Sequence, residues 1–170
     1  MARITFKGSP IRTVGTLPAV GSIAPAFRLT GADLSDVTLD NFSGARKILN
    51  IVPSLDTPVC ALSAKRFNEE IARLSGIVLL TISADLPFAQ KRFCENQSLK
   101  NVVSLSTFRS PDFGTTYGVQ IAEGPLAGLM SRAVLVLDRA NRILWTEQVP
   151  EIAQEPDYAT VWVALKKSEG

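Results

Sequence analysis

A chain of 170 residues that is 46% apolar and 20% charged is long enough to bury one core and too apolar to remain disordered. We therefore expect a single domain over residues 1–170. The net charge of +2, without a clustered Lys/Arg stripe, gives no indication of a nucleic-acid partner. No apolar run reaches the length of a membrane span and the N-terminus carries no secretion signal, so we expect no membrane association and a cytoplasmic location, with the periplasm left open.

Histidine is absent, and this excludes Ser-His-Asp and Cys-His hydrolysis, His-ligated metals and His proton shuttling. The only two cysteines, Cys60 and Cys94, cannot build an ordinary structural zinc site without histidine, and we expect neither a metal nor a cofactor. Two cysteines in a protein of this size do not form a disulfide scaffold of the secreted kind. They are therefore either inert core residues or a redox pair.

The first half of the chain predicts strands around one helix. Residues 3–13 predict an edge hairpin with its turn at "GSP", and residues 26–42 predict strand, turn and strand. "RKILNIV" at 46–52 is a continuous apolar strand of the kind buried on both faces. A helix follows from Cys60 to about Leu74, since apolar residues recur there at helical spacing, and Gly76 ends it.

The second half alternates in the same way. We expect a buried strand at 77–83, a helix at 84–97 with Asp85 as N-cap and Pro87 in its first turn, and a strand at 101–106. A helical turn within 110–119, an apolar loop at 121–131, a hairpin turning near 138–141 and a closing helix at 155–167 complete the chain. This order predicts an α/β thioredoxin-like fold with a mixed central sheet flanked by helices and an N-terminal β-hairpin extension.

The stretch "NIVPSLDTPVCAL" leaves the carboxyl end of a buried strand, where ligand sites gather in open α/β sheets. If Cys60 lies in the first turn of its helix, the free N–H groups and the helix dipole favour its thiolate. Pro58 suits a helix start, and Asp56 or Thr57 can be the N-cap. The Thr57 hydroxyl is placed to face the same pocket, and Pro53 closes the strand beside it.

A purely structural role fits the same pattern. Free cysteine is often a small buried apolar residue, and Cys60 falls on the apolar stripe of its helix. Cys94, in "RFCENQ" near a helix end, carries no reactive feature of its own.

Longer stretches resemble one family. "PSLDTPVC" matches the active-site pattern of peroxiredoxins, and "RKILNIVPSLDTPVCA", "ISADLPFAQKRFC", "YGVQIAEGPLAGL" and "SRAVLVLD" together resemble bacterial thiol peroxidases, the atypical two-cysteine peroxiredoxins. The resemblance covers essentially the whole chain. It implies that Cys60 is the peroxidatic cysteine and Cys94 the resolving cysteine of an intrachain disulfide. It also implies that Thr57 and Arg132 frame the peroxide, and that Pro53 shields the site.

The family resemblance further implies thioredoxin as the reductant, a homodimer, and hydrogen peroxide and organic hydroperoxides as substrates. A disulfide needs Cα atoms about 4.4–6.8 Å apart, so cysteines in two different helices should meet only when one or both of their segments unwind on oxidation. Pro58 departs from the glycine expected there, which puts the ease of that unwinding in question. The apolar loop Ile121 to Met130 is expected to form an apolar wall of the peroxide pocket, which predicts a preference for organic hydroperoxides.

Other functions fit the same fold. A thiol–disulfide exchange protein usually carries Cys-x-x-Cys, which this chain lacks. A redox-sensing interaction protein and an inactive module with two core cysteines are the remaining alternatives.

Overall fold

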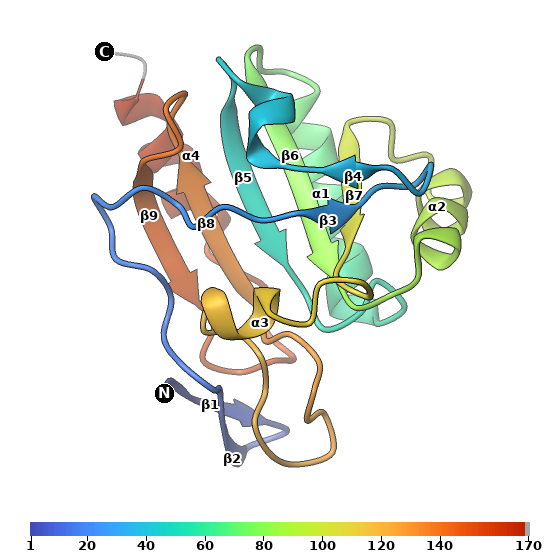
Figure 1. Cartoon of the computed structure of the whole chain (residues 1–170), viewed down its shortest axis with the longest axis vertical. Coiled ribbons are helices and arrows are strands. Elements are labelled where there is room, and N and C mark those ends of the chain that lie inside the picture. Colours follow the sequence, from blue (N-terminus) through green and yellow to red (C-terminus); the bar gives the residue numbers. More distant parts are fainter. Residues whose placement is uncertain (169–170) are drawn as a thin grey trace.

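The computed structural model describes residues 1–168 of the chain. Two separate strands form the N-terminal hairpin, β1 (Arg3–Phe6) and β2 (Ser9–Arg12). The strands of the main sheet are β3 (Leu29–Thr30), β4 (Asp36–Val37), β5 (Arg46–Ile51), β6 (Ile77–Ser83), β7 (Val102–Ser106), β8 (Ala133–Leu137) and β9 (Ile143–Gln148). Within the described residues these seven strands lie in the order β4-β3-β7-β6-β5-β8-β9 (Figure 1).

The centre of the sheet is parallel and its flanks are antiparallel. β5, β6 and β7 run parallel to one another, whereas β8 pairs antiparallel with β5 on the other side. All six side chains of β5 are buried, as the continuous apolar pattern predicts for a strand covered on both faces. Because β8 is antiparallel to β5, the residues that precede β8 lie beside those that follow β5.

The helices are α1 (Pro58–Ile71), α2 (Pro87–Asn96), α3 (Phe113–Thr116) and α4 (Tyr158–Lys167), with a 3₁₀ turn η1 (Leu39–Phe42). Apolar side chains of α1 and α4 pack on one face of β5, β6 and β8. The other face is covered by extended chain before β3, by η1 and by α3, which cross in front of the sheet in Figure 1. The predicted mixed sheet flanked by helices is confirmed, although only short helices cover the second face.

The predicted N-terminal hairpin is confirmed, but its turn was placed wrongly. The turn consists of Lys7 and Gly8, which both have positive φ angles of 51° and 77°. Two such residues match the twist of a two-residue hairpin, and this leaves Ser9 and Pro10 inside β2. Proline is tolerated there because an edge strand can dispense with an N–H donor.

The helix that follows β5 buries Cys60, Ala64, Phe67 and Ile71, as their spacing predicts. Leu74 does not continue this stripe, because α1 ends at Ile71 and the Leu74 side chain is 44% exposed.

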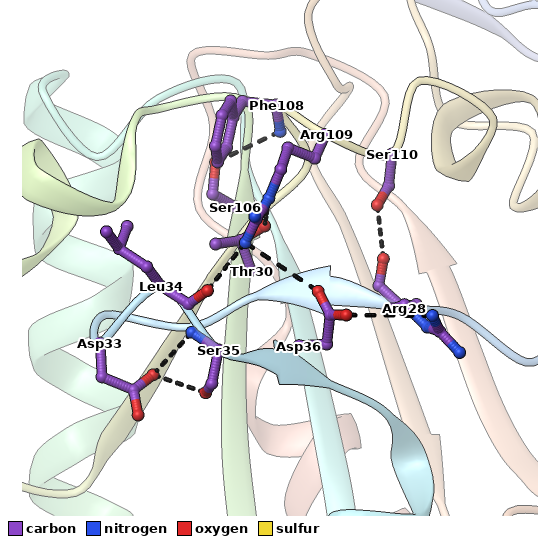
Figure 2. A network of polar contacts seen from close by, with 10 residues as sticks. All are labelled: Arg28, Thr30, Asp33, Leu34, Ser35, Asp36, Ser106, Phe108, Arg109 and Ser110. Atoms are coloured by element: carbon purple, nitrogen blue, oxygen red, sulfur yellow. Dashed lines mark hydrogen bonds and ion pairs between the residues drawn. The ribbon is translucent and has the colours of Figure 1, made fainter.

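A polar network attaches β3 and β4 to the loop after β7 (Figure 2). Arg109 donates from Nε to the Thr30 hydroxyl at 3.1 Å and from Nη2 to the Leu34 carbonyl at 2.8 Å. Asp36 lies 3.9 Å from both Arg109 and Arg28. Ser110 also donates to the Arg28 carbonyl, so side chains of the loop after β7 reinforce the attachment of β3, which pairs with β7 through a single residue pair.

The chain that follows the N-terminal hairpin passes close to residue 118. Gly118 has a φ of +70°, and a Cβ added there would lie 2.1 Å from the Thr16 carbonyl oxygen. Gly76 has a similar φ of +68°, yet a Cβ there would meet nothing within 4 Å.

We therefore expect Gly76→Ala to lower the free energy of unfolding by about 1 kcal/mol, the cost of a left-handed backbone alone. Gly118→Ala should lower it by about 3 kcal/mol or more, because the methyl group also overlaps backbone that cannot rotate away. Urea denaturation of both variants measures the difference. Equal losses would show that the contact with Thr16 is not tight.

Candidate active site

Cys60 lies in the first turn of α1, completely buried, just beyond the carboxyl end of β5. Thr57 is the N-cap, and its hydroxyl accepts a hydrogen bond from the Cys60 backbone N–H at 3.4 Å. Pro58 occupies the next position, where its missing N–H removes nothing from the helix. Of the two predicted N-caps, the structure selects Thr57 and leaves Asp56 exposed.

Arg132 lies immediately before β8 and is 1% exposed. Its Nη2 donates to the Cys60 sulfur at 3.2 Å, and its Nε donates to the Ile152 carbonyl at 2.9 Å. Within the described part of the chain, Nη1 is buried without a hydrogen-bond partner. Arg132 therefore places a permanent cation beside the sulfur, which also lies at the positive end of the helix dipole, and this arrangement requires no histidine.

Two further predicted residues lie in the loop between β5 and α1. The Thr57 hydroxyl donates to the Ser54 carbonyl at 3.2 Å and accepts from the Cys60 backbone N–H. These two hydrogen bonds fix the orientation of the hydroxyl at the start of α1. The Val52 backbone N–H, just after β5, still donates to the Ile82 carbonyl of β6. Pro53 follows directly and is buried. The structure thus brings Thr57 and Arg132 each into contact with Cys60, and Pro53 lies in the same loop as Thr57.

Cys94, in α2, is a free thiol and only partly buried, and Cys60 is free as well. The Cys94 sulfur lies 3.2 Å from the Ser104 hydroxyl on β7. Burial raises the pKa of the Cys94 thiol, an effect that the Ser104 hydrogen bond opposes and the Glu95 carboxylate reinforces. Cys94 also packs against the hydrophobic cluster that contains Cys60, so both sulfurs belong to one apolar region.

Asp85 is not the N-cap of α2, the role that its place in the sequence predicts. The N-cap is Leu86, and its side chain makes no capping bond. The Asp85 carboxylate instead accepts from Ser54 Oγ, from the Leu55 backbone N–H and from Ser83 Oγ, each at 2.7 Å. It therefore ties the loop before Cys60 to the segment that leads into the Cys94 helix.

A groove of 780 Å³ separates the start of α1 from α2. Its walls are Leu55, Asp56, Thr57, Pro58 and Ala61 on one side, and Asp85, Ala89, Arg92, Phe93, Asn96 and Gln97 on the other. The apolar loop at 121–130, which was expected to wall the site, lines no part of this groove. Ile121 packs instead with Ile4, Ile11 and Ile152, because the N-terminal hairpin covers it.

No group of three or more His, Cys, Asp or Glu side chains among residues 1–168 is arranged to hold a metal ion. No helix in the same range is long and apolar enough to cross a bilayer.

Comparison with known proteins places the chain in a family. A family model described as Redoxin matches residues 19–162. The chain belongs to the Redoxin family. It is 54% identical over 165 residues to the thiol peroxidase of Mycobacterium tuberculosis, covering 97% of this chain and 99% of that protein, and equally to the thiol peroxidase of Mycobacterium bovis.

Two solved structures of similar proteins have the same architecture. The peroxiredoxin-like protein from Aquifex aeolicus superposes with a TM-score of 0.92 at 39% identity, covering 98% of this chain and 97% of that one. The thiol peroxidase from Chromobacterium violaceum also gives 0.92, at 26% identity and the same coverage. The peroxiredoxin-type, thioredoxin-like fold is therefore confirmed, and the chain is a thiol-dependent peroxidase.

Asp85 offers a first test of this Redoxin-family site. Asp85→Asn should lower the free energy of unfolding by about 1–3 kcal/mol, because an amide cannot accept from all three donors at once. It should also slow peroxide reduction by the chain, since the loop that carries Thr57 loses its tether. Asp56→Asn, an exposed carboxylate on the same groove, is the matched control. Stopped-flow oxidation and urea denaturation that give the same values for both variants would contradict this role.

Cys94 offers a second test. In a Cys60→Ser background, the pH at which iodoacetamide alkylates Cys94 at half its maximal rate should lie above that of an exposed cysteine, because burial raises the pKa of this thiol. Ser104→Ala removes the hydrogen bond that lowers the pKa, so the midpoint should move further up. A midpoint that moves down in Ser104→Ala would show that Ser104 does not stabilise the Cys94 thiolate.

Proposed function

We propose that the chain reduces peroxides through Cys60, forms a disulfide between Cys60 and Cys94, and is recycled by thioredoxin. The observation that carries the proposal is the contact of 3.2 Å between Arg132 Nη2 and the buried Cys60 sulfur. A buried guanidinium against a sulfur has a clear chemical use when that sulfur is a thiolate nucleophile.

In the first step the Cys60 thiolate attacks the terminal oxygen of R–O–O–H. The S–O bond forms as the O–O bond breaks, which gives a sulfenic acid and an alkoxide or hydroxide that takes up a proton from water. Arg132 Nη1, buried without a partner in the described residues, is available to donate to the peroxide oxygens as negative charge moves onto them. The Thr57 hydroxyl, oriented at the helix start, lies on the wall of the adjoining groove.

In the second step the Cys94 sulfur attacks the Cys60 sulfenic acid, and water leaves as the disulfide forms. The two sulfurs start in one hydrophobic cluster but on different helices. We propose that the first turn of α1 or the end of α2 unwinds to bring them together. Two electrons from a reduced dithiol partner, thioredoxin in our proposal, then restore both thiols.

Organic hydroperoxides are the preferred substrates in this proposal. The groove beside Thr57 has apolar walls at Leu55, Pro58, Ala89 and Phe93, which suit the organic part of a hydroperoxide.

A homodimer and a cytoplasmic location are also part of the proposal and rest on the family resemblance. Exposed apolar side chains near the start of α2, with Leu86 at 53% and Phe88 at 68%, provide surface suited to a protein partner.

The test is NADPH oxidation with thioredoxin and thioredoxin reductase, started by cumene hydroperoxide or by hydrogen peroxide. The wild-type chain should turn over repeatedly, with the higher kcat/KM for cumene hydroperoxide, and Cys60→Ser should be inactive. Equal kcat/KM values would contradict the substrate preference. In Cys94→Ser, one equivalent of peroxide should leave a sulfenic acid at Cys60 where the wild type has an intrachain disulfide by non-reducing mass analysis.

The alternatives give different results in the same assay. Oxidation that stops after one equivalent favours a redox sensor, and thiol–disulfide exchange without any dependence on peroxide favours an exchange protein. Full activity in Cys60→Ser would remove Cys60 from the mechanism. Hydrogen exchange adds a check on the unwinding step, because amides near Cys60 or Cys94 should exchange faster in the disulfide form than in the dithiol form.

A further inference from the structure

The orientation of Arg132 depends on one backbone carbonyl. Its guanidinium reaches Cys60 through Nη2, and its Nε is held by the Ile152 carbonyl at 2.9 Å. If that carbonyl moved, the plane of the guanidinium would turn with it, because the two donors belong to one rigid group. The position of Ile152 therefore bears directly on the cation beside the sulfur.

The segment around Ile152 is not a strand of the main sheet, and the N-terminal hairpin holds it. The Thr5 backbone N–H donates to the Pro150 carbonyl at 2.7 Å, and the Ile152 N–H donates to the Thr5 carbonyl at 3.0 Å. A parallel bridge joins Thr5 to Glu151. Ile152 also packs with Ile4 and Ile11 of the hairpin.

The Glu151 carboxylate also joins the N-terminal hairpin to the segment around Ile152. Glu151 accepts from Thr5 Oγ1 at 2.6 Å, and from the backbone N–H groups of Lys7, Gly8 and Ala153 at 3.1 Å each. The Thr5 hydroxyl, followed by these backbone donors, lowers the pKa of Glu151 to about 2. The carboxylate is thus ionised throughout the neutral range and fastens the hairpin turn to the residue that precedes Ile152.

We infer that Glu151 is a positioning residue for peroxide reduction, because with Thr5 it fixes the Ile152 carbonyl that aims Arg132 at Cys60. The inference rests on the proposed function of Cys60 as the nucleophile. It gives the N-terminal hairpin a part in the reaction, as the outer support of the catalytic cation. Glu151 acts through Arg132 and touches neither the sulfur nor the substrate.

The test measures Cys60 reactivity without peroxide as well as with it. The variants are Glu151→Gln, which keeps one acceptor oxygen, and Thr5→Val, which removes the bond of 2.6 Å while keeping the shape of the side chain. The control is Glu123→Gln, because Glu123 binds Arg12 of the same hairpin at 2.9 and 3.0 Å and, within residues 1–168, has no hydrogen bond or ion pair to residues 150–153. All carry Cys94→Ser, so that only Cys60 reacts.

We expect Thr5→Val and Glu151→Gln to slow oxidation of Cys60 by peroxide roughly two- to thirtyfold, the range of coupling through a contact network. The pH profile of Cys60 alkylation by iodoacetamide should shift to higher pH in both variants, because a misaligned guanidinium stabilises the thiolate less. Glu123→Gln should match the wild type in both measurements. A purely structural role would lower the melting temperature but leave the pH profile in place.

A wild-type pH profile in folded Thr5→Val and Glu151→Gln overturns the inference, as does an equal shift in Glu123→Gln. Failure of the proposed function looks different. In that case the Cys94→Ser parent would not react with peroxide at Cys60, whereas the alkylation profiles would still report whether Glu151 controls Arg132.

Discussion

The contact between the Arg132 guanidinium and the Cys60 sulfur is the constraint around which the site is built. Burial of a guanidinium costs hydration that other groups must replace, and here a sulfur and a backbone carbonyl do so for two of its three nitrogen atoms. The antiparallel pairing of β8 with β5 brings Arg132 to the carboxyl end of β5, where α1 presents Cys60. In a chain without histidine, this arrangement supplies the positive charge that an imidazolium often supplies elsewhere.

The same region of the structure contains both cysteines, Cys60 and Cys94. Cys60 and Cys94 share an apolar cluster with Val52, Leu55 and Leu99, which stabilises the packed dithiol state. Asp85 adds to that stability, since its carboxylate joins the Cys60 loop to the approach of α2. In the proposed mechanism this site reacts with peroxide while it is packed, and it must be partly disrupted before Cys60 and Cys94 can form a disulfide. Fold stability and the second chemical step therefore oppose each other.

Local sequence patterns were sufficient to predict the strands and helices whose buried side chains recur at regular spacing. β5 and the stripe of α1 from Cys60 to Ile71 were predictable because burial repeats with the strand or helix period. Asp85 was misread as a cap because a carboxylate before a helix usually serves the nearest N–H groups, whereas here its partners come from another loop. Glu151 was missed for a stronger reason, since its partner Thr5 is 146 residues away and no local pattern can join them.

The three nitrogen atoms of the Arg132 guanidinium have separate tasks. Nε is fixed by the Ile152 carbonyl and Nη2 reaches the sulfur, while Nη1 is buried without a partner within residues 1–168. An unsatisfied buried donor costs about 1–3 kcal/mol in the resting protein. In the proposed reaction, a peroxide oxygen that gains negative charge as the O–O bond breaks accepts from this donor and relieves the cost. Because that charge develops in the transition state, the interaction lowers the barrier more than it tightens substrate binding.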